Sequence, residues 1–233
     1  MVRKKFEIFS KWFMKILKRY NFKLVAANGM LYALGGEALQ KDGLFDIEKF
    51  NIANGTWENS GAYLQSGPRF GFCATVSQDQ SSIFVVGGID SNGGRKRFDK
   101  LDLYSMKWTL MAEMFSGRSA FSCAPLQNGL LVAGGWSGEE FLKSVEFFDT
   151  EKEVWFEEAD MQIARANFDL VSYFDGGRQM VSALGGRSAT FNFVESIETF
   201  KDGVWEYSVP MSKAKSNVAS VVVPEGFNIF EGC

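Results

Sequence analysis

The chain has 233 residues, a net charge of −3 and no histidine. The missing imidazole excludes Ser-His-Asp and Cys-His catalysis and every histidine-ligated copper, zinc or iron site. The small negative charge supplies no field that would draw the molecule to nucleic acid, and no apolar run reaches the roughly 18 residues of a membrane span. We therefore expect no metal, no cofactor and no nucleic-acid partner.

Residues 1–18 form a basic, aromatic segment that has two interpretations. As a helix, the segment places Phe6, Phe9 and Phe13 on one face and lysines on the other, which suits an anionic membrane surface. As strands, residues 6–9 and Trp12 match the third and fourth strands of the unit that the rest of the chain repeats. We favour the strand interpretation, so a membrane-surface role is a secondary alternative.

A repeated unit begins at Arg19, and its clearest copy is 118–161. This copy has a short strand pattern at 120–126, an Asn128-Gly129 turn, an apolar run at 130–133, a third strand at 145–148 and a fourth around Trp155. Four strands with turn residues between them, in about 45 residues, are typical of a propeller blade.

In chain order the units are 19–61, 69–114, 118–161 and 165–211, followed by a partial unit, 215–233, that holds only the first two strands. Each full unit contains a glycine pair, and the distance from its first glycine to its tryptophan is 20 to 22 residues. An opening basic residue and an acidic residue in the third strand recur in the same phase. The glycines and tryptophans are Gly35, Gly36, Gly87, Gly88, Gly134, Gly135, Gly185, Gly186, Trp57, Trp108, Trp155 and Trp205.

These markers resemble those of the kelch-repeat family, and the likeness covers residues 19–233. The resemblance implies an all-β, kelch-type β-propeller of about five four-stranded blades, in which strands from 1–18 and 215–233 combine in one closing blade. Closure removes the exposed sheet edges of an open array. The alternative is a partial propeller, a fragment of a six-bladed one. The BTB and BACK regions that often precede kelch repeats have no match here.

The glycine pairs and the tryptophans are expected to be structural. A glycine has no side chain to clash, so a pair at the end of a buried strand permits close packing between blades. No phosphate-loop motif follows any of the pairs. The tryptophans are expected to pack between neighbouring blades, because large aromatic rings fill the space between sheets.

The cysteines are Cys73, Cys123 and Cys233. The first two lie in strands that should be buried, and one of the three stays unpaired in any scheme. We therefore expect no disulfide framework, and a reducing, cytoplasmic location.

The resemblance also indicates a binding surface. In such propellers the start of the first strand and the loop after the glycine pair face the same end of the central channel. The candidate partner-binding residues at these positions are Arg69, Arg118, Ser119, Arg165, Asn167, Lys215, Asp90, Arg95, Arg97, Trp136, Arg187 and Phe191. Converging arginines beside an exposed aromatic residue fit an acidic peptide, because guanidinium groups bind carboxylates through two hydrogen bonds. The alternative is that each strand-opening arginine pairs with an acidic neighbour and holds the loops.

The function that we expect is a non-enzymatic protein-interaction module. We assign no catalytic residue, because nothing in the sequence marks one of the adjacent loop carboxylates as buried. Kelch relatives hold substrates for cullin-RING ubiquitin ligases or bind actin, so the resemblance makes both roles candidates. The alternative from another class is a kelch-like enzyme that modifies a sugar or another small molecule.

Overall fold

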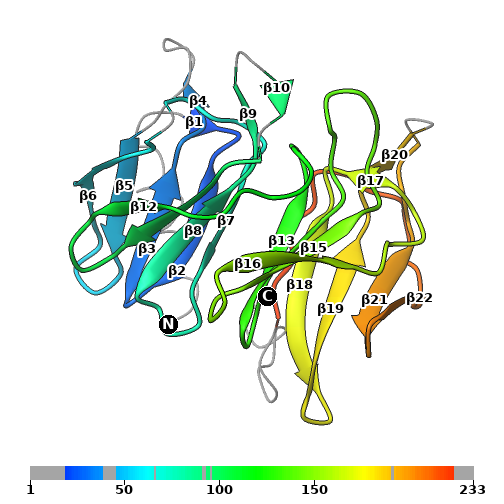
Figure 1. The fold of residues 1–233 in the computed structure, drawn as a ribbon. Helices are drawn as coiled ribbons and strands as arrows, with labels where there is room; N and C mark the ends of the chain where they lie inside the picture. The colour runs from blue at the N-terminus through cyan, green and yellow to red at the C-terminus, as the bar shows by residue number, and fades with distance from the viewer. Residues whose placement is uncertain are drawn as a thin grey trace, which may run out of the picture.

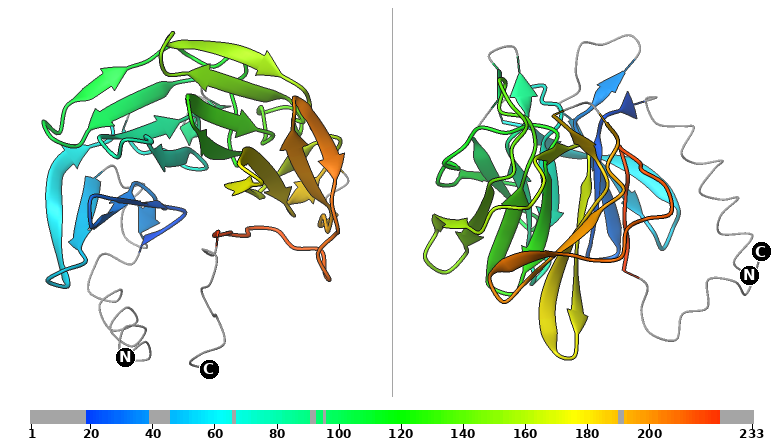
Figure 2. Two further views of the ribbon diagram at one scale, coloured as in Figure 1. Left: turned by 90° about the horizontal axis from the view of Figure 1, so that it is seen from below. Right: turned by 90° about the vertical axis from the view of Figure 1, so that its right-hand side faces the viewer.

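The computed structural model describes residues 19–38, 46–65, 67–90, 93–94, 96–189 and 192–222. These residues form four antiparallel sheets of four strands, one for each successive repeat, and β6 of the first sheet runs two residues past the expected end of its unit at Gly61. Figure 2 shows the sheets side by side around a common axis, as the blades of a propeller. The all-β expectation is therefore confirmed. None of the described residues belongs to a helix that could cross a membrane.

Blades one to four follow the order of the chain. Blade one holds β2 (Lys23–Ala27), β3 (Met30–Leu34), β5 (Asp46–Asn51) and β6 (Thr56–Tyr63). Blade two holds β7 (Cys73–Val76), β8 (Ser82–Val86), β11 (Phe98–Asp102) and β12 (Trp108–Leu110). Blade three holds β13 (Ser122–Leu126), β14 (Gly129–Ala133), β15 (Val145–Asp149) and β16 (Val154–Glu158). Blade four holds β18 (Asp169–Asp175), β19 (Arg178–Leu184), β21 (Ile197–Lys201) and β22 (Val204–Tyr207).

Three two-stranded pairs extend the blades at one end, the upper side of Figure 1. They are β1 (Arg19–Tyr20) with β4 (Glu37–Ala38), β9 (Ile89–Asp90) with β10 (Gly93–Gly94), and β17 (Arg165–Ala166) with β20 (Arg187–Ser188). These extensions bring the residues that open a unit close to the residues that follow its glycine pair.

The second strand of a blade is the part most enclosed by protein. All five residues of β8 are buried, and so are all five of β14. Both faces of these strands pack against a neighbouring blade, so they are continuous apolar runs rather than alternating ones. Hydrophobic side chains between the blades, not a single central core, therefore hold the propeller together.

The tryptophan of blade three packs as expected between two blades. Its ring centroid lies 5.6 Å from that of Phe98 in blade two and 5.1 Å from that of Phe148 in its own blade. Its indole N–H donates to the carbonyl oxygen of Ala112, at 2.7 Å. This residue thus fastens blade three to the segment that leaves blade two.

The two glycines of a pair have different roles. A Cβ on Gly134 would lie 2.6 Å from the carbonyl oxygen of Arg165 in the next blade, whereas a Cβ on Gly135 would lie 2.6 Å from that of Ser119 in its own blade. Both have positive φ, and the amide of Gly135 donates to the carbonyl of Arg165 at 2.8 Å. The first glycine thus permits contact between blades, and the second permits the local pairing.

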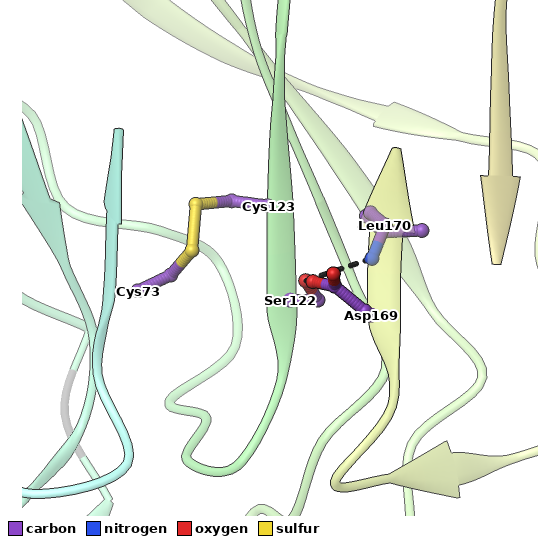
Figure 3. Close-up of a disulfide and its surroundings, with 5 residues drawn as sticks. All are labelled: Cys73, Ser122, Cys123, Asp169 and Leu170. Carbon is purple, nitrogen blue, oxygen red and sulfur yellow. Dashed lines mark hydrogen bonds between the residues drawn. A yellow bond between two sulfur atoms is a disulfide. The ribbon is translucent and has the colours of Figure 1, made fainter. Parts of the chain in front are cut away.

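A disulfide joins Cys73 to Cys123, across the innermost strands of blades two and three (Figure 3). The expectation that no disulfide forms is therefore wrong. The two thiols occupy positions offset by one residue in successive units: Cys73 is the fourth residue after its opening arginine and Cys123 the fifth. Because alternate residues point to opposite faces of a strand, this offset turns the two side chains toward each other. Counting cysteines could not reveal this.

The closing blade lies largely outside the described residues. Both interpretations of 1–18 fall on residues that the structure does not describe, as does the expected strand at 227–230. Residues 216–222 continue beside blade four without regular strand structure, although a first strand was expected there. Their contact with blade four is nevertheless strand-like, because the amide of Asn217 donates to the carbonyl of Asn167 at 2.8 Å.

Candidate binding face at one end of the channel

The segments expected to share one end of the channel are paired there. The opening arginine of blade four pairs with Ser188 through β17 and β20, and Ser119 forms an isolated bridge with Trp136. Phe70 forms a similar bridge with Ile89. Two of these contacts involve strands of the two-stranded extensions, β17 and β9, which lie at the upper end of Figure 1, and the Ser119–Trp136 bridge is the equivalent pairing in blade three. We call this end the mouth of the channel.

The strand-opening arginines are not exposed at the mouth. Arg118 is 0 % exposed, and its guanidinium lies 2.6 Å from a carboxylate oxygen of Glu146 in the third strand of the same blade. A second guanidinium nitrogen donates to the carbonyl of Gly134 at 2.8 Å. Arg165 is also fully buried and pairs with Glu198 in the same way. Burial lowers the pKa of both arginines, and the facing carboxylate opposes this shift.

The other two blades repeat the arrangement. Arg69 is 1 % exposed and lies 2.7 Å from Asp99, and Arg19 lies 2.6 Å from Glu48. The expectation that Arg69, Arg118 and Arg165 bind a partner is therefore corrected. Buried charges must be paired, and the acidic residue of the third strand supplies the pair. The opening basic residue and the acidic residue recur together because they contact each other.

The carboxylates also hold the chain that enters each blade. Glu146 accepts hydrogen bonds from the backbone amides of Phe115 and Ser116, at 2.7 and 3.0 Å. Glu198 accepts in the same way from the amides of Gln162 and Ile163. Each ion pair therefore joins the third strand, the glycine pair and the linker in one network.

Backbone hydrogen bonds form a belt around the mouth. The amide of Ala120 donates to Gly71, that of Asn167 to Ala120, and that of Asn217 to Asn167, each at 2.8 Å. Each of these residues lies two positions after the basic residue that opens its unit, and each has a positive φ between 51° and 58°. Glycine and asparagine tolerate this conformation better than most residues.

A cavity of about 420 Å³ opens inside the belt. Its lining combines polar residues of the belt with phenylalanines of the inner strands: Asn21, Phe22, Lys23, Phe70, Gly71, Phe72, Ala120, Phe121, Asn167, Phe168, Asn217 and Val218. Burial lowers the pKa of the Lys23 ammonium, and the charge of Asp169 opposes this shift. Lys23 makes no ion pair with any described residue, so its charge remains available to a bound group.

Aromatic side chains also lie on the loops that follow the glycine pairs of blades three and four. Trp136 is half-buried and meets Phe141 edge to face, with ring centroids 5.1 Å apart. The guanidinium of Arg187 lies 5.8 Å above the ring of Phe193, which is 58 % exposed. Stacking of this kind holds the arginine side chain in place.

The remaining candidates are placed as follows. Ser119 is buried, Lys215 is exposed beside blade four, and Arg97 is half-buried, 2.7 Å from Asp99. Asp90 belongs to β9, but its side chain is not described, and Arg95 and Phe191 lie outside the described residues. Within the described residues the structure thus brings Asn167, Trp136 and Arg187 to the mouth.

Sequence reasoning missed three residues of the mouth: Asn21, Lys23 and Phe193. The first two had a signal, because Asn21 and Lys23 stand two and four positions after an opening arginine, as Asn167 and Asp169 do. Phe193 had none, because it lies in a loop whose length varies between units.

In blades two, three and four, the residue four positions after the opening arginine contacts the next unit along the chain. Ser122 donates to Asp169 at 3.1 Å and accepts from the amide of Leu170 at 3.0 Å, as Figure 3 shows beside the disulfide. Asp169 in turn accepts from the amide and the hydroxyl of Ser220, at 2.6 and 2.7 Å. At this position of the innermost strands, a disulfide therefore joins blades two and three, and hydrogen bonds join blade three to blade four and blade four to the segment that follows it.

Residues 21–218 match a family model described as the KLHDC2/KLHL20/DRC7 Kelch-repeats domain. The chain therefore belongs to the kelch-repeat family. It is 24% identical over 191 residues to a RING finger domain and kelch repeat-containing protein of Dictyostelium discoideum, with 81% of this chain and 18% of that protein covered. It is 26% identical over 189 residues to Kelch-like protein 35 of Mus musculus, covering 79% and 30%. The chain thus spans less than a third of the length of these relatives.

A solved structure of a protein named YjhT superposes with a TM-score of 0.73, covering 85% of this chain and 73% of that one. Its sequence identity is 14%, so this likeness shows the fold alone.

Proposed function

We propose that this kelch chain is a non-enzymatic protein-interaction module that binds its partner at the mouth of the channel. The observation that carries the proposal is the cavity of about 420 Å³ inside the backbone belt. Trp136, Phe141 and Phe193 lie on the loops that bridge to the segments opening blades three and four. Aromatic and arginine side chains around a pocket are the usual anchors of protein interfaces. The ion pairs beneath the rim hold this surface rigid, which lowers the entropy cost of binding.

The partner that we propose is a protein with an acidic segment. Because the strand-opening arginines are held in internal ion pairs, the carboxylate would be met by Lys23 inside the cavity. Lys23 has no competing ion pair among the described residues, and amide groups of Asn167 and Asn217 line the same cavity. A side-chain carboxylate held there would gain charge-assisted hydrogen bonds.

Two partner classes remain proposals: components of a cullin-RING ubiquitin ligase, and actin. The name of the Dictyostelium relative places a RING finger domain in one chain with kelch repeats, which favours the ligase class. Fold alone does not select between the two classes, because propellers differ in their loops.

Affinity purification of the tagged chain from its own cells tests the proposal. We expect the partner to be recovered with the wild type and lost with Lys23→Gln, while Lys107→Gln, an exposed lysine in the β11–β12 turn, retains it. A partner that binds both variants equally well contradicts the assignment to the mouth. Turnover of a sugar by the purified chain would instead favour the enzyme alternative.

We also propose a cytoplasmic location, against which the Cys73–Cys123 disulfide is the opposing observation. In a reducing compartment the two cysteines should be free thiols, because glutathione and thioredoxin keep them reduced. Alkylation of intact cells followed by mass spectrometry of the two peptides decides the question, since a disulfide protects both from the reagent.

A further inference from the structure

The hairpin turns between the first two strands of each blade gather at the end opposite to the mouth. In two cases a glutamine in or beside one turn reaches the turn of the preceding blade. Gln80 of blade two accepts from the amide of Asn28 in blade one at 3.0 Å, and Gln179 of blade four accepts from the amide of Gln127 in blade three at 2.8 Å. Each glutamine closes the gap between its blade and the preceding one.

Blades two and three lack such a bridge. The described residues of the turn after β7 make no hydrogen bond with those of the turn after β13, and a cleft of about 350 Å³ opens between them. The residues that line it are Ser77, Gln78, Asp79, Ser81, Ser82, Phe84, Lys100, Met111, Leu126, Gln127, Gly129, Phe148, Thr150 and Glu153. The volume is at the lower end of the range of about 300–1,000 Å³ for small-molecule sites.

The cleft has an apolar floor. Phe84 of blade two is 5 % exposed and Phe148 of blade three is 0 % exposed, and both belong to the cluster that packs the two blades together. Met111 and Leu126 are partly exposed beside them. The same cluster contains Cys73 and Cys123, so the disulfide fixes the two walls of the cleft at the level of the inner strands. The site is thus preformed rather than a gap between mobile parts.

A lysine without an ion pair lies in the cleft. Lys100 is half-buried on β11 and makes no ion pair within the described residues. Its equivalent in blade one, Lys49, lies 3.8 Å from Glu58 on the neighbouring strand. The residue opposite Lys100 on β12 is Thr109, which carries no charge. A half-buried ammonium of this kind favours a negatively charged group beside it.

The opposite charge lies at the outer rim. Asp79 is in the exposed turn of one wall and Glu153 in the exposed turn of the other. Hydrogen bonds from Ser77 and Ser81 lower the pKa of Asp79 to about 2, so this carboxylate is ionised at neutral pH. The cleft therefore carries a positive charge at Lys100 and negative charges at Asp79 and Glu153 on its two walls, above an apolar floor.

We propose that this cleft binds a small zwitterion with an apolar side chain, namely a free amino acid of the phenylalanine kind. Its carboxylate would contact Lys100, its ammonium group would face Asp79 and Glu153, and its side chain would cover Phe84 and Met111. The two rim carboxylates repel a simple organic anion, and Lys100 repels a simple amine, so only a molecule with both charges satisfies the site. This site is independent of the mouth and of the function proposed for it.

Isothermal titration calorimetry of the purified chain with three compounds tests the proposal. L-phenylalanine carries both charges, phenylacetate lacks the ammonium group, and phenethylamine lacks the carboxylate. We expect saturable binding of phenylalanine and affinities lower by about tenfold or more for the other two, since each loses a charge-assisted contact. Absence of saturable heat up to roughly 10 mM phenylalanine, a dissociation constant worth less than about 3 kcal/mol of binding free energy, overturns the proposal. Equal affinity for phenylalanine and either analogue does so as well.

Substitution assigns the binding to this cleft. Lys100→Gln should weaken phenylalanine binding by about tenfold and should not weaken the binding of phenethylamine, because that amine has no carboxylate for the lysine to meet and is repelled by its charge. Lys49→Gln, the equivalent change in blade one, should leave phenylalanine binding unchanged. Unchanged phenylalanine affinity in Lys100→Gln, with the circular dichroism spectrum of a folded protein, overturns the assignment.

Discussion

Breaking the Cys73–Cys123 disulfide should lower the stability of the propeller without unfolding it. The bond closes a loop with a sequence separation of 50 residues. The chain-entropy relation for a loop of this length gives about 4 kcal/mol, most of it from the restricted unfolded chain. The contacts between blades two and three that remain include the hydrogen bond from Ala120 to Gly71 and the packing of Trp155 on Phe98. The reduced protein should therefore stay folded.

Urea denaturation followed by tryptophan fluorescence measures the effect, with and without a reductant. Reduced wild type should lose about 2–4 kcal/mol of unfolding free energy, the range found for natural disulfides. The unfolding free energy of the double variant Cys73→Ala/Cys123→Ala should not change when the reductant is added. This control separates loss of the disulfide from other effects of the reagent. A loss below about 1 kcal/mol in reduced wild type would refute the reasoning, since it would mean that the disulfide does not restrict the unfolded chain as the entropy relation assumes.

Three further predictions concern the repeat and its turns. Glu146→Gln should cost about 3–5 kcal/mol in urea denaturation, because it leaves a buried arginine without its charge partner; a loss under 1 kcal/mol would contradict the pairing. Gly134→Ala should destabilise the fold more than Gly138→Ala, because both have positive φ but only the first Cβ meets backbone atoms within 4 Å; equal melting temperatures would show that the close approach has no cost. The depressed pKa of Asp79 stabilises the fold above its unfolded value of about 3.9, and this contribution is lost as the pH falls toward about 2. Ser77→Ala should make the loss of urea stability between roughly pH 4 and 2 shallower, and an unchanged slope would contradict it.

The repeat was predictable because each of its markers is a local requirement. The glycine pairs stand where the chain turns with positive φ, and the apolar runs of the second strands stand where both faces of a strand are covered. Both signals recur at the period of the blade. They therefore identified the units, although not the places where one blade meets another.

The residues that meet at the mouth were predicted only in part. The sequence located the mouth correctly, since the pairing of Ser119 with Trp136 joins the two expected segments there. The strand-opening arginines were assigned to partner binding from the sequence, but they form ion pairs within their own blades. A repeated arginine by itself does not distinguish these two roles. Lys23, at the same spacing as Asp169, is the cation that lines the cavity.

What the sequence by itself determined is the period, the four-stranded unit and the kelch family, because these depend on residues close together in the chain. Only the tertiary structure decided which charged side chains form internal ion pairs. Arg118 and Glu146 are 28 residues apart and become partners only when the third strand lies beside the first glycine of the pair. It also decided that Cys73 meets Cys123, since a one-residue offset between units matters only when two blades face each other. Contacts between blades depend on the angle and distance of whole sheets, which no local pattern encodes.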